Sequence, residues 1–351
     1  MKISFFCIAT EPLKNKYPVE ESIRSVLPLC DEVVVVLGRT EKASEKILRN
    51  LSKKIRIFYT SLWPIDWSYD VMTYHFDYAL KKCTGDYCVK FDIDYVFDYN
   101  TPDILRNILE KNSKYHKLTF RKYNYIDRNH WMILDRGPYV VNTKLLMEES
   151  GDRDSFYIGN KNYMNELIME GKMNEKIYGG DDLRVFNYDC TFMDFKLFYE
   201  KHYRWYNAYF KKWGNLDHFG MKRKFLENRE QFVDFIIKRT RERIVYSIKK
   251  KRIYFDNKNF NPELIRDRLG GIKREMYGYN FFGKINLNKL LYNTYKVDKI
   301  KDNYNLIKNY LVILNNNEDF LKGCNKENII NGLKKCYKKK KWVKITKFIK
   351  K

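Results

Sequence analysis

Residues 31–38 read Asp31-Glu32-Val33-Val34-Val35-Val36-Leu37-Gly38, a β-branched run bounded by a turn-forming Asp and Gly. Valine is favoured in strands because its branched side chain packs well on a pleated surface. A run that is apolar at successive positions, without alternation, is typical of a strand that is covered on both faces. We therefore predict that residues 32–37 form an inner strand of a sheet with helices on either side.

Strands and helices alternate on both sides of this run. Besides residues 32–37, the pattern predicts strands at Ile3–Ala9, Ile55–Tyr59 and Tyr87–Ile93, with helices at Val19–Leu29, Lys42–Leu51 and Ser68–Lys82. Strands that alternate with helices at this spacing indicate βαβ units, so the predicted fold class is α/β with a mostly parallel sheet. Residues 117–145 instead hold short β-like pieces between polar turns, which predicts an antiparallel excursion.

Two acidic residues stand at the end of the fourth predicted strand, in Phe91-Asp92-Ile93-Asp94-Tyr95. Ligands of open α/β sheets bind at this edge, and strand alternation would put both carboxylates on one side. Two buried like charges are costly unless a cation compensates them. Hard oxygen ligands suit Mg²⁺ or Mn²⁺, so we predict a divalent metal at Asp92 and Asp94. Aspartates that merely end a strand are the simpler alternative.

A second acidic pair follows two glycines in Tyr178-Gly179-Gly180-Asp181-Asp182. Glycine allows a close backbone approach, and Asp182 is predicted to begin a helix with Asp181 near its cap. One interpretation of this pair is a plain helix cap. The alternative is that one carboxylate is a general base and the other orients an acceptor. His218 can add an imidazole ligand to a metal that carboxylates already hold.

The net charge of the 351-residue chain is +24, and it is unevenly distributed. Residues 221–351 hold 35 Lys and Arg against 13 Asp and Glu, whereas residues 1–220 hold 33 against 31. We predict a globular domain at 1–224 and a basic, mainly helical module at 225–351, with helices at 232–248, 262–269, 301–314 and 334–351. A basic module suits nucleic acid, an anionic membrane or an acidic glycan. An AT-rich genome, which favours Lys, Asn, Ile and Tyr, is an equally good explanation.

The last predicted helix is basic and amphipathic, because Trp342, Ile345 and Ile349 would share one face. Such a helix can lie on an anionic membrane, or it can pack on the catalytic domain. The seven cysteines include no CxxC pair, which argues against a zinc framework or a disulfide scaffold. No apolar stretch approaches the roughly 18 residues of a membrane helix. We predict a cytoplasmic protein, with peripheral membrane contact as an open alternative.

Together these features resemble a GT-A glycosyltransferase, close to family 2, the large inverting family, from Met1 to about Lys224. The resemblance rests on Ile3–Thr10, Glu20–Val26, Asp31–Val36, Ala79-Leu80, Thr84–Tyr87, Phe91–Asp94, Gly180-Asp181-Asp182 and His218-Phe219-Gly220. The order and spacing of these stretches carry it, because each motif alone is weakly specific. Asp181 stands where the family more often has Glu.

The resemblance implies metal-dependent transfer of a sugar from a nucleotide sugar, a UDP-sugar in first place, with inversion. The acceptor would be a hydroxyl of a glycan, a lipid-linked molecule or a protein. The family's residue roles, carried over by position, would put Thr10 and Glu11 beside the nucleotide, Asp92 at the ribose and the metal, Asp94 and His218 on the metal, Asp182 as the base and Asp181 on the acceptor.

Two further groups of residues complete the predicted site. Relatives often hold the nucleobase with an Asp after the second strand, but here the chain reads Leu37-Gly38-Arg39, so Arg39 is predicted to meet a donor phosphate. Trp131 and Trp205 are the favoured sugar-stacking residues, because polar residues flank them.

Two other classes of protein stay open. A sugar nucleotidyltransferase on a similar sheet would need a Gly-rich loop with a basic residue after the first strand, where this chain has Thr10-Glu11-Pro12-Leu13. A basic nucleic-acid-binding protein would explain the charge but not the two acidic pairs, which repel phosphate unless a metal is bound.

Overall fold

The computed structural model describes residues 1–38, 42–60, 69–127, 130–135, 137–145, 174–194, 196–203, 253–255 and 261–271. One sheet has seven strands, in the spatial order β10 (Glu175–Tyr178), β6 (Lys117–Phe120), β9 (Tyr139–Asn142), β4 (Tyr87–Lys90), β1 (Ile3–Ala9), β2 (Glu32–Leu37) and β3 (Ile55–Tyr59). The other has five, in the order β12 (Ile253–Phe255), β8 (His130–Leu134), β7 (Lys122–Asp127), β11 (Leu183–Asn187) and β5 (Tyr95–Tyr99). The protein is therefore mixed α/β with a largely parallel central sheet.

The valine run behaves as predicted. Strand β2 pairs in parallel with β1 on one side and with β3 on the other. Val33 and Val35 belong to one core cluster, and Val34 and Val36 belong to another on the opposite face of the sheet. Since all four side chains are 0% exposed, the missing alternation correctly indicated a strand covered on both sides.

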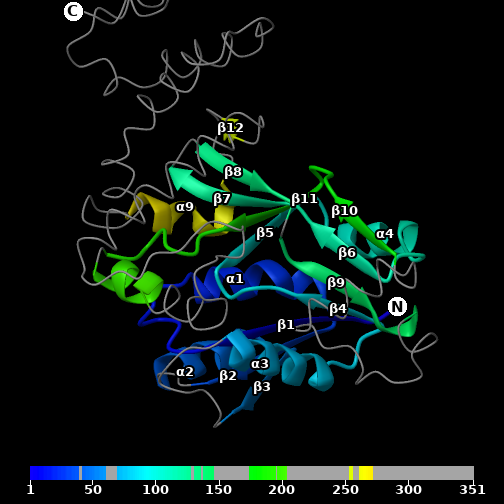
Figure 1. Ribbon diagram of the computed structural model, residues 1–351, viewed down its shortest axis with the longest axis horizontal. Coiled ribbons are helices and arrows are strands. Elements are labelled where there is room, and N and C mark those ends of the chain that lie inside the picture. Colours follow the sequence, from blue (N-terminus) through cyan, green and yellow to red (C-terminus); the bar gives the residue numbers. More distant parts are fainter. Residues whose placement is uncertain are drawn as a thin grey trace, which may run out of the picture.

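Helices cover the two faces of the large sheet. Helix α1 (Val19–Val26), continued by a short 3₁₀ turn, lies between the two sheets, and α2 (Lys42–Leu51) contacts it (Figure 1). Helix α3 (Tyr69–Lys82) packs on the other face of β1 and β2. These helices confirm the three predicted between the first four strands. A fourth, α4 (Ile104–Lys111), follows β5.

The antiparallel excursion predicted for residues 117–145 is also present. Strand β9 pairs antiparallel with β4 and β6, and β7 pairs antiparallel with β8. The second sheet packs on α1, where the backbone N–H of Phe97 donates to the Ser25 hydroxyl at 3.0 Å. Phe97 then completes an edge-to-face cluster with Phe5 and Phe91, which joins β1 and β5 through one core.

Two predicted elements differ from the structure. The fourth strand ends at Lys90 rather than Ile93, so Asp92 and Asp94 lie in a turn between β4 and β5 and not on a strand. The chain leaves the large sheet here, because Tyr95 begins a strand of the second one. The residues after Asp182 form strand β11 instead of a helix, because Leu183, Val185 and Phe186 are buried between β5 and β7.

Two described segments beyond residue 225 pack on the first part of the chain. Strand β12 pairs with β8, and α9 (Glu263–Gly270) confirms the helix predicted at 262–269. Arg268 of α9 forms an ion pair with Glu21 and donates to the carbonyl oxygens of Lys16 and Tyr17. The domain boundary near residue 225 stays a prediction, and the helices predicted at 232–248, 301–314 and 334–351 lie outside the described residues.

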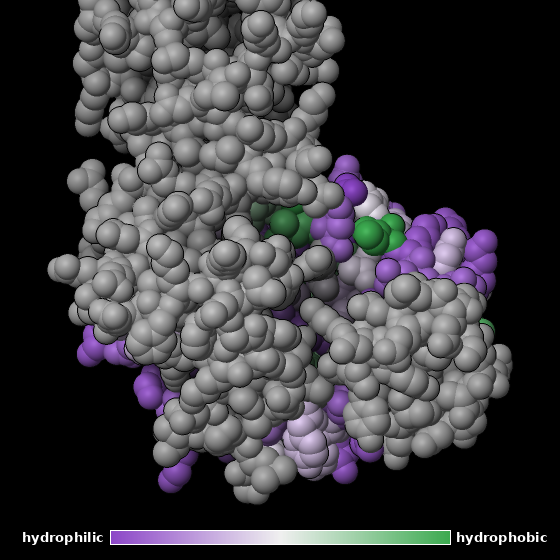
Figure 2. All heavy atoms as spheres, in the orientation of Figure 1, coloured by the Kyte–Doolittle hydropathy of each residue, from purple (hydrophilic) through white to green (hydrophobic). Residues whose placement is uncertain are grey.

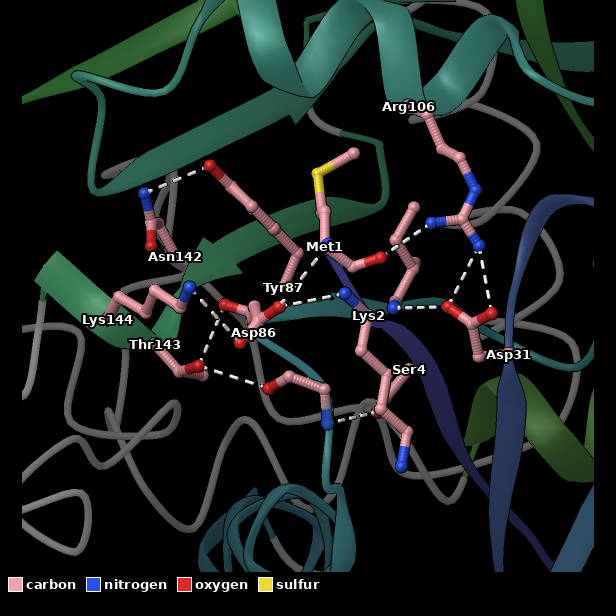
Figure 3. A network of polar contacts seen from close by, with 12 residues as sticks. Met1, Lys2, Ser4, Asp31, Asp86, Tyr87, Arg106, Asn142, Thr143 and Lys144 are labelled. Carbon is pink, nitrogen blue, oxygen red and sulfur yellow. Dashed lines mark hydrogen bonds and ion pairs between the residues drawn. The ribbon is translucent and has the colours of Figure 1, made fainter.

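The amino-terminal edge of the large sheet is fastened by structural polar contacts (Figure 3). The carboxylate of Asp31 accepts from the backbone N–H of Ile3 at 2.8 Å and from Arg106 at 2.9 Å. Gly85 donates its N–H to the Ser4 hydroxyl at 2.8 Å, and a Cβ at Gly85 would lie 2.6 Å from that oxygen. The Asp31 carboxylate at this edge therefore has protein partners, and its role there is structural.

Glu32, at the same edge, supplies a prediction about acid stability. Burial disfavours its charged form, but hydrogen bonds from Ser4, Arg56 and Thr84 outweigh that cost and lower its pKa from 4.5 to about 2. The stabilisation is present above pH 4.5 and is lost as the pH falls towards 2. Glu32→Gln should lower the free energy of unfolding by roughly 3 kcal/mol at pH 7. Urea unfolding from pH 7 to pH 2 should show the two proteins converging in acid; a constant difference would contradict it.

The described surface is mainly hydrophilic on the face that Figure 2 shows, with isolated hydrophobic residues. The large exposed hydrophobic side chains are scattered, at Met1, Tyr59, Tyr74, Ile177 and Leu264. None of the helices in the described ranges combines the length and apolar character needed to cross a membrane.

Candidate active site

The carboxyl edge of β1 and β4 brings the first acidic pair beside the second sheet. The N–H of Phe91 donates to the carbonyl oxygen of Phe6, which keeps the chain beside β1 for one residue beyond β4. The N–H of Tyr95 then donates to the carbonyl of Asp92 at 3.0 Å, closing a tight turn that contains both aspartates. The turn therefore lies where ligands of open α/β sheets bind.

Asp92 has a cation of its own. The ammonium group of Lys90, two residues earlier on β4, donates to Asp92 Oδ1 at 2.5 Å. Burial raises the pKa of Asp92, but the attraction of Lys90 outweighs it and keeps the pKa below its usual value. Lys90 also lies 4.4 Å from the centre of the Phe76 ring, which fixes its direction. Asp92 is thus held ionised without a metal, and its side chain is 37% exposed.

Asp94 lacks such compensation. Asp94 is 8% exposed, and its Oδ1 oxygen has no hydrogen-bond partner within the described part of the chain. Burial raises its pKa well above the usual range, and the nearby carboxylates of Asp189 and Asp92 raise it further. A buried carboxylate oxygen without a donor is costly. Asp94 is therefore the residue of this site that most needs a cation.

A third carboxylate, which the sequence did not single out, lies beside Asp94. Strand β11 runs antiparallel to β5, and the N–H of Tyr188 donates to the carbonyl of Asp94 at 3.0 Å. The next residue, Asp189, forms an ion pair with Lys201 of the helical segment 196–203. Burial opposes ionisation of Asp189, but Lys201 lowers its pKa to about 2.

Lys122 is a third lysine close to the turn that holds Asp92 and Asp94. It is the first residue of β7, and its ammonium group donates to the Tyr95 hydroxyl at 2.9 Å. Burial lowers its pKa, whereas the charges of Asp92 and Asp94 act in the opposite direction. Three carboxylates and three lysines from five segments of the chain thus lie in and around this turn. Sequence inspection could find Asp92 and Asp94, but the positions of Lys122 and Asp189 depend on long-range strand pairing.

The loop after β1 has an unusual backbone at its predicted nucleotide-binding end. Glu11 and Lys16 adopt φ angles of 44° and 60°, in the left-handed region that non-glycine residues rarely adopt. The Asn15 amide donates to the carbonyl oxygens of Thr10 and Glu11 and stabilises the turn. The Glu11 carboxylate pairs with Lys14 at 3.0 Å. Thr10 and Glu11 thus follow β1 at the same edge as Asp92.

The second acidic pair lies at the carboxyl end of β10, three strands from β4. Asp182 Oδ1 accepts from the Tyr178 hydroxyl at 2.6 Å, and Asp181 accepts from the Tyr123 hydroxyl at 3.2 Å. Gly180 makes the first contact possible, because a Cβ there would lie 2.5 Å from the Tyr178 oxygen. The length of β11 separates Asp182 from Asp94, which is about 16 Å for five extended residues. The structure thus does not bring the two acidic pairs together.

The predicted aromatic and basic residues divide into two groups. Trp131 is 0% exposed and packs against Phe186 in the core of the second sheet, so it is a core residue and not a sugar-stacking surface. Its polar neighbours in the sequence were misleading, because strand alternation turns Trp131 inward. Arg39, Trp205 and His218 lie outside the described residues.

The donor set suits a divalent cation that is shared with a substrate. In the described ranges, no three His, Cys, Asp or Glu side chains are grouped closely enough to hold an ion by themselves. Mg²⁺ is commonly held by one or two carboxylates together with substrate phosphates. The open Oδ1 of Asp94, with Asp92 next to it, fits that mode of binding.

Comparisons with known proteins give weak similarities only. No protein-family model matches the chain, and no curated protein matches it either. Among solved structures, a mannosyltransferase from Pyrobaculum calidifontis in complex with GDP-Man and Mn²⁺ is 10% identical, with 97% of this chain and 88% of that chain covered and a TM-score of 0.38.

Two further solved structures show similarities of the same low level. S. aureus TarS 1–349 is 13% identical, covering 71% of this chain and 88% of its own, with a TM-score of 0.38. An inositol-1-phosphate CTP transferase from T. maritima is 13% identical, covering 54% and 89%, with a TM-score of 0.34. These similarities are too weak to carry the function of those proteins over to this chain.

Proposed function

We propose that this chain is a glycosyltransferase that moves a sugar from a nucleotide sugar, a UDP-sugar in first place, to an acceptor hydroxyl. The observation that carries the proposal is Asp94, a buried carboxylate with an open oxygen at the carboxyl edge of the sheet. The resemblance of the first two-thirds of the sequence to GT-A enzymes supports the same reading.

Departure of a nucleoside diphosphate requires compensation of its negative charge, and the proposed roles of the site residues follow from that requirement. A divalent cation, when bound, neutralises the charge that develops on the leaving phosphates. Asp94 would hold it, with Asp92 beside it and His218 as a further ligand. Lys90 orients Asp92, so this carboxylate is preorganised before the donor enters. Arg39 is proposed to contact a donor phosphate, and Thr10 and Glu11 to lie beside the nucleotide.

Nucleotide release tests the proposal and distinguishes it from the hypothesis of a nucleotidyltransferase. Purified protein is offered UDP-, GDP- and dTDP-sugars with Mn²⁺, Mg²⁺ or EDTA, and thermal unfolding is recorded in the same samples. We expect one nucleoside diphosphate to appear only with metal, and the same donor to raise the melting temperature only with metal. Pyrophosphate from a nucleoside triphosphate and a sugar phosphate would establish the nucleotidyltransferase instead. The proposal is overturned if neither product forms and the melting temperature shows no metal-dependent shift.

Asp182 is tested separately, because its separation from Asp94 bears on its role. A general base must lie within hydrogen-bond reach of the proton that it takes, and the length of β11, about 16 Å of extended backbone, lies between Asp182 and Asp94. We expect Asp182→Asn to raise the acceptor KM, as for an acceptor-binding residue, and to change kcat less than tenfold. A fall in kcat of about 10²–10⁴ with unchanged donor binding would establish Asp182 as the base. Asp181→Asn should act on the acceptor KM in the same way.

A further inference from the structure

Six charged side chains meet at the candidate site: Lys90, Asp92, Asp94, Lys122, Asp189 and Lys201. We call them the lysine–carboxylate cluster. Two of its carboxylates have their own ion pair, because Lys90 holds Asp92 and Lys201 holds Asp189. Asp94 differs, because its buried Oδ1 is without a donor in the part of the chain that the structure describes. The cluster therefore has three lysines, three carboxylates and, at Asp94, a buried acceptor oxygen that has no donor among the described residues.

The ion pair of Asp189 and Lys201 is built into the fold. Lys201 is 7% exposed, and its ammonium group lies 4.6 Å from the centre of the Tyr17 ring. Tyr17 belongs to the loop after β1, which Arg268 of α9 holds through two carbonyl oxygens. The position of Asp189 is fixed in turn by the pairing of β11 with β5. A buried lysine held in this way is not an incidental surface contact.

The charges of this pair must be felt at Asp94. The backbone N–H of Tyr188, the residue before Asp189, donates to the carbonyl oxygen of Asp94 at 3.0 Å, and Lys201 is paired with Asp189, so both charges lie close to Asp94. Asp189 accordingly disfavours the ionised form of Asp94, and Lys201 favours it. In a site of low effective dielectric constant, a charge a few ångströms away changes the binding of a divalent ion by a large factor. Removing the negative member should therefore weaken cation binding, and removing the positive member should strengthen it.

We propose that Asp189 and Lys201 set the affinity of the Asp94 site for its divalent cation from outside the coordination shell, as positioning residues. Asp189 increases the affinity for the ion, and Lys201 decreases it, so that the ion binds firmly only when donor phosphates complete its shell. The proposal rests on the proposed function, because that function requires the cation at Asp94. It adds two residues to the site and assigns opposite effects to them.

The test uses Mn²⁺ alone with the 351-residue chain, two single variants and their double variant. The loss of the free Mn²⁺ signal in electron paramagnetic resonance gives the dissociation constant without donor, acceptor or turnover. We expect Asp189→Asn to weaken Mn²⁺ binding by about tenfold or more, and Lys201→Met to tighten it by a similar factor. The double variant, which leaves neither member unpaired, should return to within about threefold of the wild type.

A purely structural role cannot produce opposite changes in Mn²⁺ affinity in the two single variants. If the pair only holds the fold together, both single variants loosen the site, and both weaken Mn²⁺ binding. That result, or no change in either variant, would overturn the inference and leave the proposed function intact. A wild-type protein that binds no Mn²⁺, with or without nucleotide, would overturn the metal site itself and the inference with it.

Lys201→Arg keeps the test decisive if a neutral variant does not fold. Arginine preserves the charge but changes the shape of the group, so a charge effect predicts an affinity within about twofold of the wild type. A large change with Lys201→Arg would show that packing rather than charge controls the site. Cooperative thermal unfolding of every variant is recorded first, and the metal concentration that half-activates nucleotide release should shift in the same direction as the Mn²⁺ dissociation constant.

Discussion

Asp94→Asn is expected to abolish metal-dependent nucleotide release and, at the same time, to stabilise the metal-free protein. Loss of the carboxylate removes the buried oxygen at which we propose that the cation binds, so we expect a fall of at least 10²-fold, in the range that positioned charge typically contributes. The same change removes a buried, uncompensated charge from beside Asp189 and Asp92. Relief of that cost should amount to about 1 kcal/mol or more, which raises the melting temperature by a few degrees.

The pH dependence of this stabilisation follows from the direction of the pKa shift. Burial and the neighbouring carboxylates raise the pKa of Asp94 well above its unfolded value, so the folded protein binds more protons than the unfolded chain. Stability from this group is therefore lost as the pH rises above the unfolded pKa. The difference between Asp94→Asn and the wild type should be near zero at pH 3 and should grow towards neutral pH.

Asp103→Asn is the matched control. Asp103 stands just before α4, is exposed and makes no side-chain hydrogen bond to cap that helix. Its substitution should change neither nucleotide release nor the melting temperature. A variant Asp94→Asn that stays active while it becomes less stable would show that Asp94 is a structural residue. It would also remove the observation that carries the proposed function.

Much of the fold could be predicted from local patterns, because parallel α/β units are encoded locally. The unbroken valine run gave β2, and the alternation of strands and helices gave the parallel half of the large sheet. Tyr95–Tyr99 escaped prediction, because nothing in the run from Tyr87 to Tyr99 marks the point where the chain changes sheets. The structure shows that point as the turn at Asp92 to Asp94, which is also the candidate site.

The site itself could be predicted only in part. Asp92 and Asp94 stand two positions apart in sequence and their chemistry is visible, whereas Asp189 is brought there by the pairing of β11 with β5, and Lys201 by its ion pair with Asp189. The segment after Asp182 shows a different error: an acidic pair after two glycines predicted a helix start, but burial of Leu183 and Val185 made the following segment a strand. Local sequence reports side-chain chemistry well and long-range proximity poorly.

Trp131→Ala is the second substitution with a large expected effect, and it acts on stability. Trp131 is fully buried and packs edge-to-face on Phe186. Its core cluster also contains Ile265 and Leu269 of α9, so this core holds that helix against the second sheet. Truncation of a buried tryptophan typically costs about 3–5 kcal/mol. Since whole domains are stable by only about 5–15 kcal/mol, urea unfolding should show a large fall in the midpoint.

The outcome also decides between the two roles considered for Trp131. A sugar-stacking surface would lose acceptor affinity on truncation and leave the free energy of unfolding almost unchanged. Truncation of a core residue instead lowers the free energy of unfolding. Trp131→Phe, which keeps an aromatic ring, should recover a large part of that loss of stability. Because Arg268 of α9 also holds the loop after β1, loosening of this core should reach that loop. We therefore expect weaker donor binding by Trp131→Ala as a consequence of the lost packing, and its recovery in Trp131→Phe together with stability.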